Sequence, residues 1–262
     1  MDPWNPTQYD KFRREREQPF HDLLALIRPF PSMSIVDLGC GTGRLTRLLH
    51  EALGARETVG IDQSARMLET AKRDPLPPGL RFELGTIESG LPNGAYDLVF
   101  SNAAFHWVTD HTALVARLVR ALKPGGQLAF QVPAMHTNPS HVVADRLTSA
   151  EPFREAFGGW RRPQPVLEPD QYSRLLFKAG IPDPNVRLII YPHVLAGRDE
   201  VVEWMKGTLL TEYEKHLSPD RYEEFLTAYR DRLLPELEDA RPFFFPFRRI
   251  LCWGRRPAQD QD

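Results

Sequence analysis

Three glycines stand close together in the run VDLGCGTGRLT, between an apolar stretch and a segment with helical spacing. Gly39, Gly41 and Gly43 form a GxGxG pattern. Glycines in a strand-to-helix loop let the backbone turn sharply and allow a ligand to approach it closely. Asp62 ends the next apolar run, VGID, where its carboxylate can accept hydrogen bonds from ribose hydroxyls. The loop and Asp62 together predict a ligand site at the carboxyl edge of a sheet.

The spacing of the glycines excludes two common ligands. A dinucleotide fingerprint requires GxGxxG, and this chain has Arg44 where the last glycine would stand. The GxxxxGK[ST] pattern of a triphosphate loop is also absent. Adenosine without a pyrophosphate is therefore the predicted ligand. Asp37, inside the same run, either contacts that ligand or braces the loop.

The elements that must position these residues follow from the rhythm of the sequence. From Ile35 to Phe130, short β-rich runs alternate with amphipathic stretches, which is typical of βαβ units and a parallel sheet. Leucines at helical spacing predict a helix from Thr42 to Leu53, and Gly54 ends it. The nearly continuous apolar runs SIVDL and YDLVF are typical of central strands covered on both faces.

After Pro133 this rhythm is lost, and a proline-rich passage precedes the helix-like QYSRLLFKAG and the strand-like VRLIIY. A helical region from Asp199 to Glu238 follows, and FRRILCW is expected to be a final edge strand. We expect one domain over residues 1–262. Within it we expect a cofactor-binding core at 30–133, lid or substrate-binding additions at 1–29, 134–180 and 199–240, and late strands at 184–191 and 246–254.

Composition limits the class of partner. Lys plus Arg number 33 and Asp plus Glu number 35, so the formal net charge of -2 gives no attraction to nucleic acid or anionic lipid. The two cysteines, Cys40 and Cys252, have no metal-ligand spacing, and no apolar run approaches the ~18 residues of a membrane span. These features favour a cytoplasmic protein that acts on a small molecule and has no metal site, and we expect it to be a monomer.

Four runs, in this order, resemble the class I S-adenosylmethionine-dependent methyltransferases: VDLGCGTGRLT, VGIDQSARMLETA, YDLVFSNAAFHWV and LKPGGQLAFQVP. The resemblance implies S-adenosylmethionine as cofactor and a Rossmann-like α/β fold. That fold has a seven-stranded, mostly parallel sheet with helices on both faces, an antiparallel last strand and here a helical lid insertion. It implies that Asp37 and the backbone of Gly39 and Gly41 hold the methionine part, and Asp62 the ribose. The full set of implied cofactor contacts is Asp37, Gly39, Gly41, Gly43, Asp62, Gln63, Met67, Thr86, Ile87 and Asn102.

Within that superfamily, the start PWNPTQYDKFRRERE, the FSNAAFHWVTDH segment and the ending FRRILCWGRR are similar to the branch that methylates trans-aconitate. Two positions depart from that branch. Thr86 stands where an acidic residue is expected beside the adenine, so recognition there would fall to Thr86 and to backbone groups around Ile87. Gln18 stands where a second arginine is expected near the lid.

The chemistry implied by that branch requires positioning more than proton transfer. A carboxylate with a pKa near 4 is already ionised at pH 7, so it can attack the methyl carbon without a general base. Arginine matches a carboxylate with its forked guanidinium, which makes Arg16 and Arg248 or Arg249 candidate anion-binding residues. The expected substrate-binding residues are Arg16, Tyr9, Trp107, Tyr191, His193 and Arg249. The candidates for a catalytic role are His106, Tyr191 and His193.

Two alternatives stay open at this stage. The same core would serve a hydroxyl or nitrogen methyltransferase, in which His106 could act as a general base. The [ND]PPY segment of adenine and glutamine amino methyltransferases is replaced here by Asn102, Ala103, Ala104 and Phe105, which disfavours that chemistry. A non-catalytic module that only binds S-adenosylmethionine is the second alternative.

Overall fold

The computed structural model describes residues 13–258, with side chains from residue 17 onward. Its chain divides into two compact units. Among the described residues, the sheet unit comprises 16–133, 165–189 and 249–258, and the helical unit comprises 13–15, 134–164 and 190–248.

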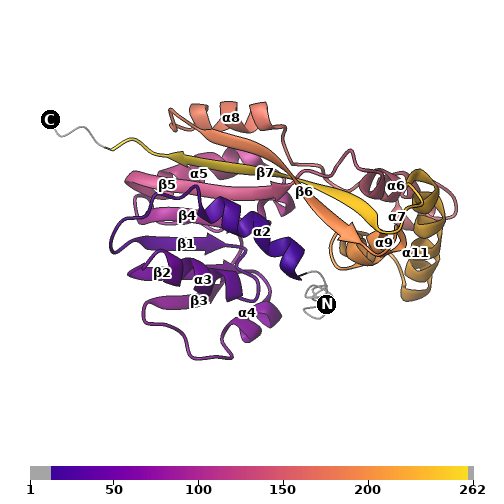
Figure 1. Cartoon of the computed structure of the whole chain (residues 1–262), viewed down its shortest axis with the longest axis horizontal. Coiled ribbons are helices and arrows are strands. Elements are labelled where there is room, and N and C mark those ends of the chain that lie inside the picture. The colour runs from indigo at the N-terminus through magenta and orange to yellow at the C-terminus, as the bar shows by residue number, and fades with distance from the viewer. Residues whose placement is uncertain (1–12, 259–262) are drawn as a thin grey trace. The chain divides into compact units, whose positions relative to one another are not determined.

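The strands form a seven-stranded sheet with the order β3-β2-β1-β4-β5-β7-β6 (Figure 1). β1 pairs in parallel with β2 and β4, β2 with β3, and β4 with β5, whereas β7 runs antiparallel to β5. The strands are β1 (Ser34–Leu38), β2 (Glu57–Asp62), β3 (Leu80–Leu84), β4 (Tyr96–Asn102), β5 (Leu122–Pro133), β6 (Asn185–Leu195) and β7 (Phe243–Arg255). The predicted Rossmann-like fold is confirmed.

The expectation that FRRILCW is an edge strand is wrong, because β7 lies between β5 and β6, and β6 occupies the edge. β7 also begins three residues before the predicted 246–254, at Phe243. Its side chains alternate, with Phe243, Phe245 and Phe247 buried and Phe244 exposed. This period of two is typical of a strand, but Pro246 and the run of consecutive aromatic residues concealed it in the sequence.

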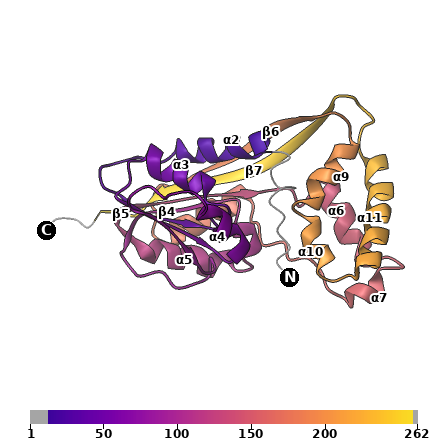
Figure 2. The ribbon, with the colours of Figure 1, turned by 90° about the horizontal axis from the view of Figure 1, so that it is seen from below.

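Helices cover both faces of the sheet unit. α2 (Arg13–Leu24) and α3 (Arg44–Ala52) lie on one side of the strands, and α5 (His111–Ala121) lies on the other (Figure 2). Phe20 and Leu23 of α2 and Leu49 of α3 are fully buried in one apolar cluster with Ile35 and Phe100 of the strands. Burying one such side chain contributes about 1.5–3 kcal/mol, so this cluster fixes the strand from which the glycine loop leaves.

The opposite face of the sheet is partly covered by α8 (Pro169–Lys178). Tyr172 of α8 is fully buried and packs edge to face on Phe130 of β5, with ring centroids 5.5 Å apart. The last part of the predicted addition 134–180 is therefore a covering helix of the sheet. The remaining helices of the sheet unit are α4 (Ala65–Ala71) and the short 3₁₀ helix η1 (Phe105–Trp107).

The helical unit has its own apolar core. Trp204 and Tyr213 are almost fully buried together with Phe153, Phe225 and Tyr229. Figure 2 shows α6, α9 and α11 side by side. The helices are α6 (Pro139–Leu147), α7 (Arg154–Phe157), α9 (Asp199–Lys206), α10 (Leu210–Glu214), α11 (Pro219–Leu233) and η2 (Leu234–Glu236). The helical character predicted for 199–238 is thus present, and its role as a lid stays a prediction.

No helix in the part of the chain that the structure describes is long and apolar enough to cross a membrane.

Candidate functional site

The glycine loop joins β1 to α3 at the carboxyl edge of the sheet. Gly39, Gly41 and Gly43 all adopt positive φ angles, of 76°, 56° and 73°. A Cβ at position 39 would lie 2.3 Å from the Cβ of Ala104, and one at position 43 would lie 2.5 Å from the ring of Phe82. Two of the glycines are therefore required by the close approach of neighbouring elements, in addition to their backbone conformation.

Gly41 differs from its neighbours in the loop. A Cβ built there would meet nothing within 4 Å, so the surface above it is open to a ligand. Its N–H donates to Oδ2 of Asp62 at 2.8 Å, and the N–H of Ser64 donates to Oδ1 of Asp62 at 2.9 Å. These two bonds fix the Asp62 carboxylate beside the glycine loop. A carboxylate oxygen can accept more than one hydrogen bond, so Asp62 can also accept from ribose hydroxyls.

Asp37 lies beneath the loop and is only 3% exposed. The hydroxyl of Thr46 donates to Oδ2 at 2.6 Å, while Oδ1 has no hydrogen-bond partner among the residues that the structure describes. The pKa of Asp37 is raised to about 7, mainly by burial. The hydrogen bond from Thr46 offsets part of this increase, and the nearby charge of Asp62 adds to it. A buried carboxylate oxygen without a donor is costly, and the ammonium group of a methionine moiety would supply the missing charge and donors. The loop, Asp62 and Asp37 together thus fit S-adenosylmethionine.

The residues predicted around the adenine lie on two neighbouring segments. Met67 is buried in α4, and Gln63 is exposed at the end of β2. Thr86 is exposed and shares a hydrogen bond with the Ser89 hydroxyl at 3.0 Å. The carbonyl of Ile87 accepts a hydrogen bond from Nη2 of Arg117 at 3.3 Å. These two contacts hold the loop after β3, and the adenine contacts themselves stay predictions.

The FSNAAFHW segment turns away from β4 directly opposite the glycine loop. Ala103 has a positive φ of 56°, which is uncommon for a residue with a side chain. Ala104, next in the chain, is the residue whose Cβ would collide with a side chain at Gly39. η1 then carries His106 and Trp107, which are half-buried with ring centroids 4.5 Å apart. Both predicted residues therefore follow the strand whose end adjoins the cofactor loop.

Arg249 and Asn102 are joined by a residue that the sequence analysis did not single out. Nη1 of Arg249 donates to Oε1 of Gln131 at 3.0 Å, and Nε2 of Gln131 donates to Oδ1 of Asn102 at 2.7 Å. Arg249 is only 5% exposed and Gln131 is fully buried. The polar Gln131 within the apolar strand GGQLAFQVP was the available signal. This network links β4, β5 and β7 and holds a buried cation beside the end of β4.

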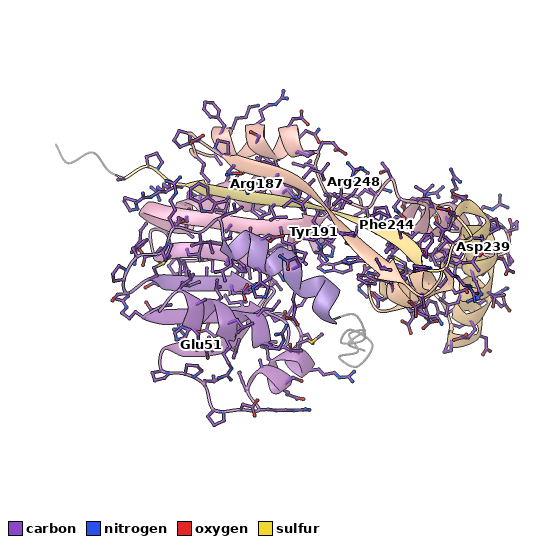
Figure 3. All side chains as sticks on the ribbon, viewed as in Figure 1. Glu51, Arg187, Tyr191, Asp239, Phe244 and Arg248 are labelled. Atoms are coloured by element: carbon purple, nitrogen blue, oxygen red, sulfur yellow. The ribbon has the colours of Figure 1, made fainter. Side chains whose placement is uncertain are left out.

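Tyr191 and His193 belong to the helical unit and are buried on β6, with exposed fractions of 5% and 4%. The ring of His193 stacks on Trp204 with centroids 4.7 Å apart. Figure 3 labels Tyr191 on β6 and Arg248 on β7. The backbone of Arg248 bonds to residues 134 and 135 of the same unit. Substrate contacts by these three residues stay predictions.

The predicted N-terminal contacts are described only in part. Tyr9, like the start of the predicted addition 1–29, lies outside the described residues, and the structure does not describe the side chain of Arg16. Gln18 is exposed and its side chain donates to Asp22 at 2.9 Å, within α2. Glu17 forms an ion pair with Arg44 at the start of α3. The position expected to hold a second arginine is thus part of a side-chain pair on the helix surface.

Comparisons with known proteins agree with this geometry. Residues 36–130 match the family described as "Methyltransferase domain". Trans-aconitate 2-methyltransferase of Deinococcus radiodurans is 40% identical over 260 residues, which cover 97% of this chain and 98% of that protein. The solved structure of the YcgJ protein from Bacillus subtilis has a TM-score of 0.61 at 18% identity, and covers 92% of this chain and 99% of its own.

A second solved structure is that of phosphoethanolamine N-methyltransferase 2 from Haemonchus contortus, in complex with phosphomonomethylethanolamine and S-adenosylhomocysteine. It has a TM-score of 0.53 at 18% identity and covers 92% of this chain and 52% of its own. At such identities the two structures show a shared fold. The relative from Deinococcus shows more, because its 40% identity extends over nearly the whole of both chains. This chain therefore belongs to the trans-aconitate 2-methyltransferase family and is an S-adenosylmethionine-dependent methyltransferase.

Proposed function

We propose that this enzyme transfers the methyl group of S-adenosylmethionine to a carboxylate of trans-aconitate, giving a methyl ester. The observation that carries the proposal is the buried guanidinium of Arg249 beside Gln131 and Asn102, at the end of β4. A buried cation at that edge favours an anionic acceptor, and the relative from Deinococcus is a trans-aconitate 2-methyltransferase.

The cofactor supplies an electrophilic methyl group on a sulfonium, and the chain supplies the positioning. In this proposal Asp37 and the N–H groups of the glycine loop hold the methionine part, and Asp62 holds the ribose hydroxyls. Gln63, Met67, Thr86 and Ile87 surround the adenine. Asn102 lies where the cofactor and the acceptor meet, because Gln131 connects it to Arg249.

Arg249 is the proposed anion-binding residue for the acceptor. Its guanidinium orients one carboxylate by charge-assisted hydrogen bonds, so that another carboxylate of the same molecule can face the methyl carbon. Trp107 would form part of the wall that keeps water from the sulfonium. A carboxylate acceptor needs no proton removed, so no residue is assigned as general base.

The test is a reaction of the purified enzyme with S-adenosylmethionine and a panel of small acids, read by product mass. We expect trans-aconitate to gain one methyl group, which alkali removes because it is an ester. Mono- and dicarboxylates of similar length belong in the panel because Gln18 replaces an expected arginine. An alkali-stable methyl group on a hydroxyl compound, with no ester from any acid, would overturn the proposal. Cofactor binding without turnover on any acceptor would favour a non-catalytic binding module.

A further inference from the structure

His111, the first residue of α5, is bonded on both ring nitrogens inside the sheet unit. Nε2 lies 2.9 Å from the carbonyl oxygen of Phe105, and Nδ1 lies 2.6 Å from the hydroxyl of Tyr172. His111 is 3% exposed and Tyr172 is fully buried. Three elements, η1, α5 and α8, therefore meet at one imidazole ring.

The partners determine which nitrogen carries the proton. A carbonyl oxygen can only accept, so Nε2 of His111 must be the N–H donor to Phe105. In a neutral ring Nδ1 is then an acceptor, and the Tyr172 hydroxyl donates to it. Burial lowers the pKa of His111, which favours this neutral form, although the backbone carbonyls around the ring raise it. The orientation of the ring is consequently fixed from both ends.

The segment held by this ring needs external support. Ala103, two residues before Phe105, has a positive φ of 56°, a conformation that costs about 1–3 kcal/mol in a non-glycine residue. Such a conformation persists only where the surroundings impose it. The carbonyl of Phe105 also accepts the N–H of Val108 at 2.9 Å, so it closes the single turn of η1. His111 thus bonds to the atom that defines the turn bearing His106 and Trp107.

Helix capping does not account for His111. Asp110 already caps α5, because its side chain accepts the N–H of Ala113 at 2.9 Å. Two apolar side chains of similar size could replace His111 and Tyr172, and neither the imidazole nor the hydroxyl would then have to be desolvated. Such a replacement often costs no stability. The hydrogen-bonded pair of His111 and Tyr172 instead fixes the direction of the Phe105 carbonyl that it contacts.

We propose that His111 and Tyr172 are positioning residues for the acceptor side of the site. Through the Phe105 carbonyl they hold η1 so that Trp107 and His106 face the acceptor at one fixed distance from the glycine loop. The inference rests on the proposed function in placing the acceptor beside η1. It assigns no proton transfer to either residue.

Three substitutions separate the two hydrogen bonds. Tyr172→Phe removes the donor to Nδ1 and little volume. His111→Gln places an amide nitrogen near the position of Nε2 and so can retain the bond to Phe105, whereas His111→Asn reaches only the level of Nδ1. Tyr229→Phe is the matched control, because it also removes a buried tyrosine hydroxyl. That hydroxyl donates to the backbone carbonyl of Ser140 at 2.9 Å.

We expect His111→Asn, which loses the bond to Phe105, to raise the KM for the acid acceptor about tenfold. Tyr172→Phe and His111→Gln lose only the bond at Nδ1 and should raise it about threefold. The Kd for S-adenosylhomocysteine, measured by calorimetry, should stay within twofold of wild type in all variants. Tyr229→Phe should lower the melting temperature about as much as Tyr172→Phe does, and it should leave the KM unchanged.

A second readout needs no acceptor. Hydrogen exchange of the Trp107 and Val108 amides should accelerate at least tenfold in His111→Asn bound to S-adenosylhomocysteine, and not in Tyr229→Phe. Imidazole ¹⁵N shifts of wild type should show the Nε2–H form at His111. An Nδ1–H form, or exchange rates and acceptor KM that match the Tyr229→Phe control, would overturn the positioning role. A wild-type enzyme that makes no ester, yet shows the expected tautomer and exchange, would overturn the proposed function alone.

Discussion

The two sides of the site in the sheet unit are built differently. On the cofactor side, Asp37, the glycine loop and Asp62 come from β1 and β2, within 26 residues of one another in the sequence. On the acceptor side, Asn102, Gln131 and Arg249 come from β4, β5 and β7, and are brought together only by strand register. The cofactor side relies on backbone conformation and a short motif, and the acceptor side relies on side chains that meet across the sheet. Mutations on the cofactor side should therefore change the affinity for S-adenosylhomocysteine, and mutations on the acceptor side should change the KM for the acceptor.

The largest effect is expected at the contact between the two sides. Gly39→Ala would place a Cβ 2.3 Å from that of Ala104 while φ is +76°, so both the loop and the FSNAAFHW turn would have to move. We expect more than a hundredfold loss of affinity for S-adenosylhomocysteine, measured by calorimetry. Gly54→Ala is the control, since its Cβ meets no atom within 4 Å, its φ is also positive, and it lies outside the cofactor loop. Equal losses in both variants would show that backbone strain in general, and not the contact between position 39 and Ala104, lowers the affinity.

Asp62→Ala should have the next largest effect, and only on the cofactor. The variant removes a charged acceptor from the ribose hydroxyls and from the N–H groups of Gly41 and Ser64. A hydrogen bond to a charged group contributes about 1.5–3 kcal/mol, so we expect the Kd for S-adenosylhomocysteine to rise about a hundredfold. The acceptor KM at saturating cofactor should change less than threefold. Unchanged cofactor affinity in a folded variant would remove Asp62 from the ribose site.

Arg249 provides the converse test on the acceptor side. Arg249→Lys keeps a positive charge but loses the fork that bonds Gln131 and matches a carboxylate. We expect the acceptor KM to rise about thirtyfold, which corresponds to about 2 kcal/mol, with cofactor affinity within threefold of wild type. Arg248→Lys is the matched control, with the same substitution one residue earlier on β7. A larger effect at 248 than at 249 would mean that the neighbouring arginine binds the acid.

The difference between the sides also explains how far the sequence could be interpreted. Gly39, Gly41, Gly43 and Asp62 are recognisable because each is needed for a local backbone conformation or follows the loop at a fixed distance. Gln131 was missed because a polar residue in an apolar strand does not reveal its partners until register places it between Asn102 and Arg249. The edge position of FRRILCW was mispredicted for the same reason: strand order depends on pairing between distant segments. His111 and Tyr172 are 61 residues apart and carry no common motif.

Asp37 should give a smaller effect that depends on pH. In the folded protein its pKa is about 7, above the ordinary value. Its contribution to the free energy of unfolding is therefore fully present below pH 4 and is lost as the pH rises through 7. A cofactor ammonium binds the charged form, so affinity should be highest above pH 7 and fall below it, levelling off about tenfold lower near pH 5.5. Asp37→Asn should bind S-adenosylhomocysteine about tenfold more weakly than wild type at pH 8, and about equally at pH 5.5.

Calorimetry across this pH range in two buffers of different ionisation enthalpy would also report the proton released on binding. The free energy of unfolding of apo Asp37→Asn should exceed that of wild type at pH 8 and match it near pH 4. A pH-independent ratio of affinities would mean that Asp37 only braces the loop through Thr46.

The smallest effect is expected at His106, and it separates a carboxylate acceptor from a hydroxyl acceptor. A carboxylic acid with a pKa near 4 is fully ionised from pH 6 to pH 8, whereas a hydroxyl must lose its proton during the transfer. If the acceptor is an acid, His106→Asn should keep kcat within twofold of wild type. The pH profile of kcat should be flat over that range, provided that saturating cofactor offsets the titration of Asp37. His106 also packs against Trp107 at 4.5 Å, so a modest rise in acceptor KM is compatible with lost packing. A tenfold fall in kcat would instead assign His106 the general-base role. A hydroxyl acceptor would be shown if this fall were found together with two further results. The wild-type rate would rise with pH, and the product would be stable to alkali.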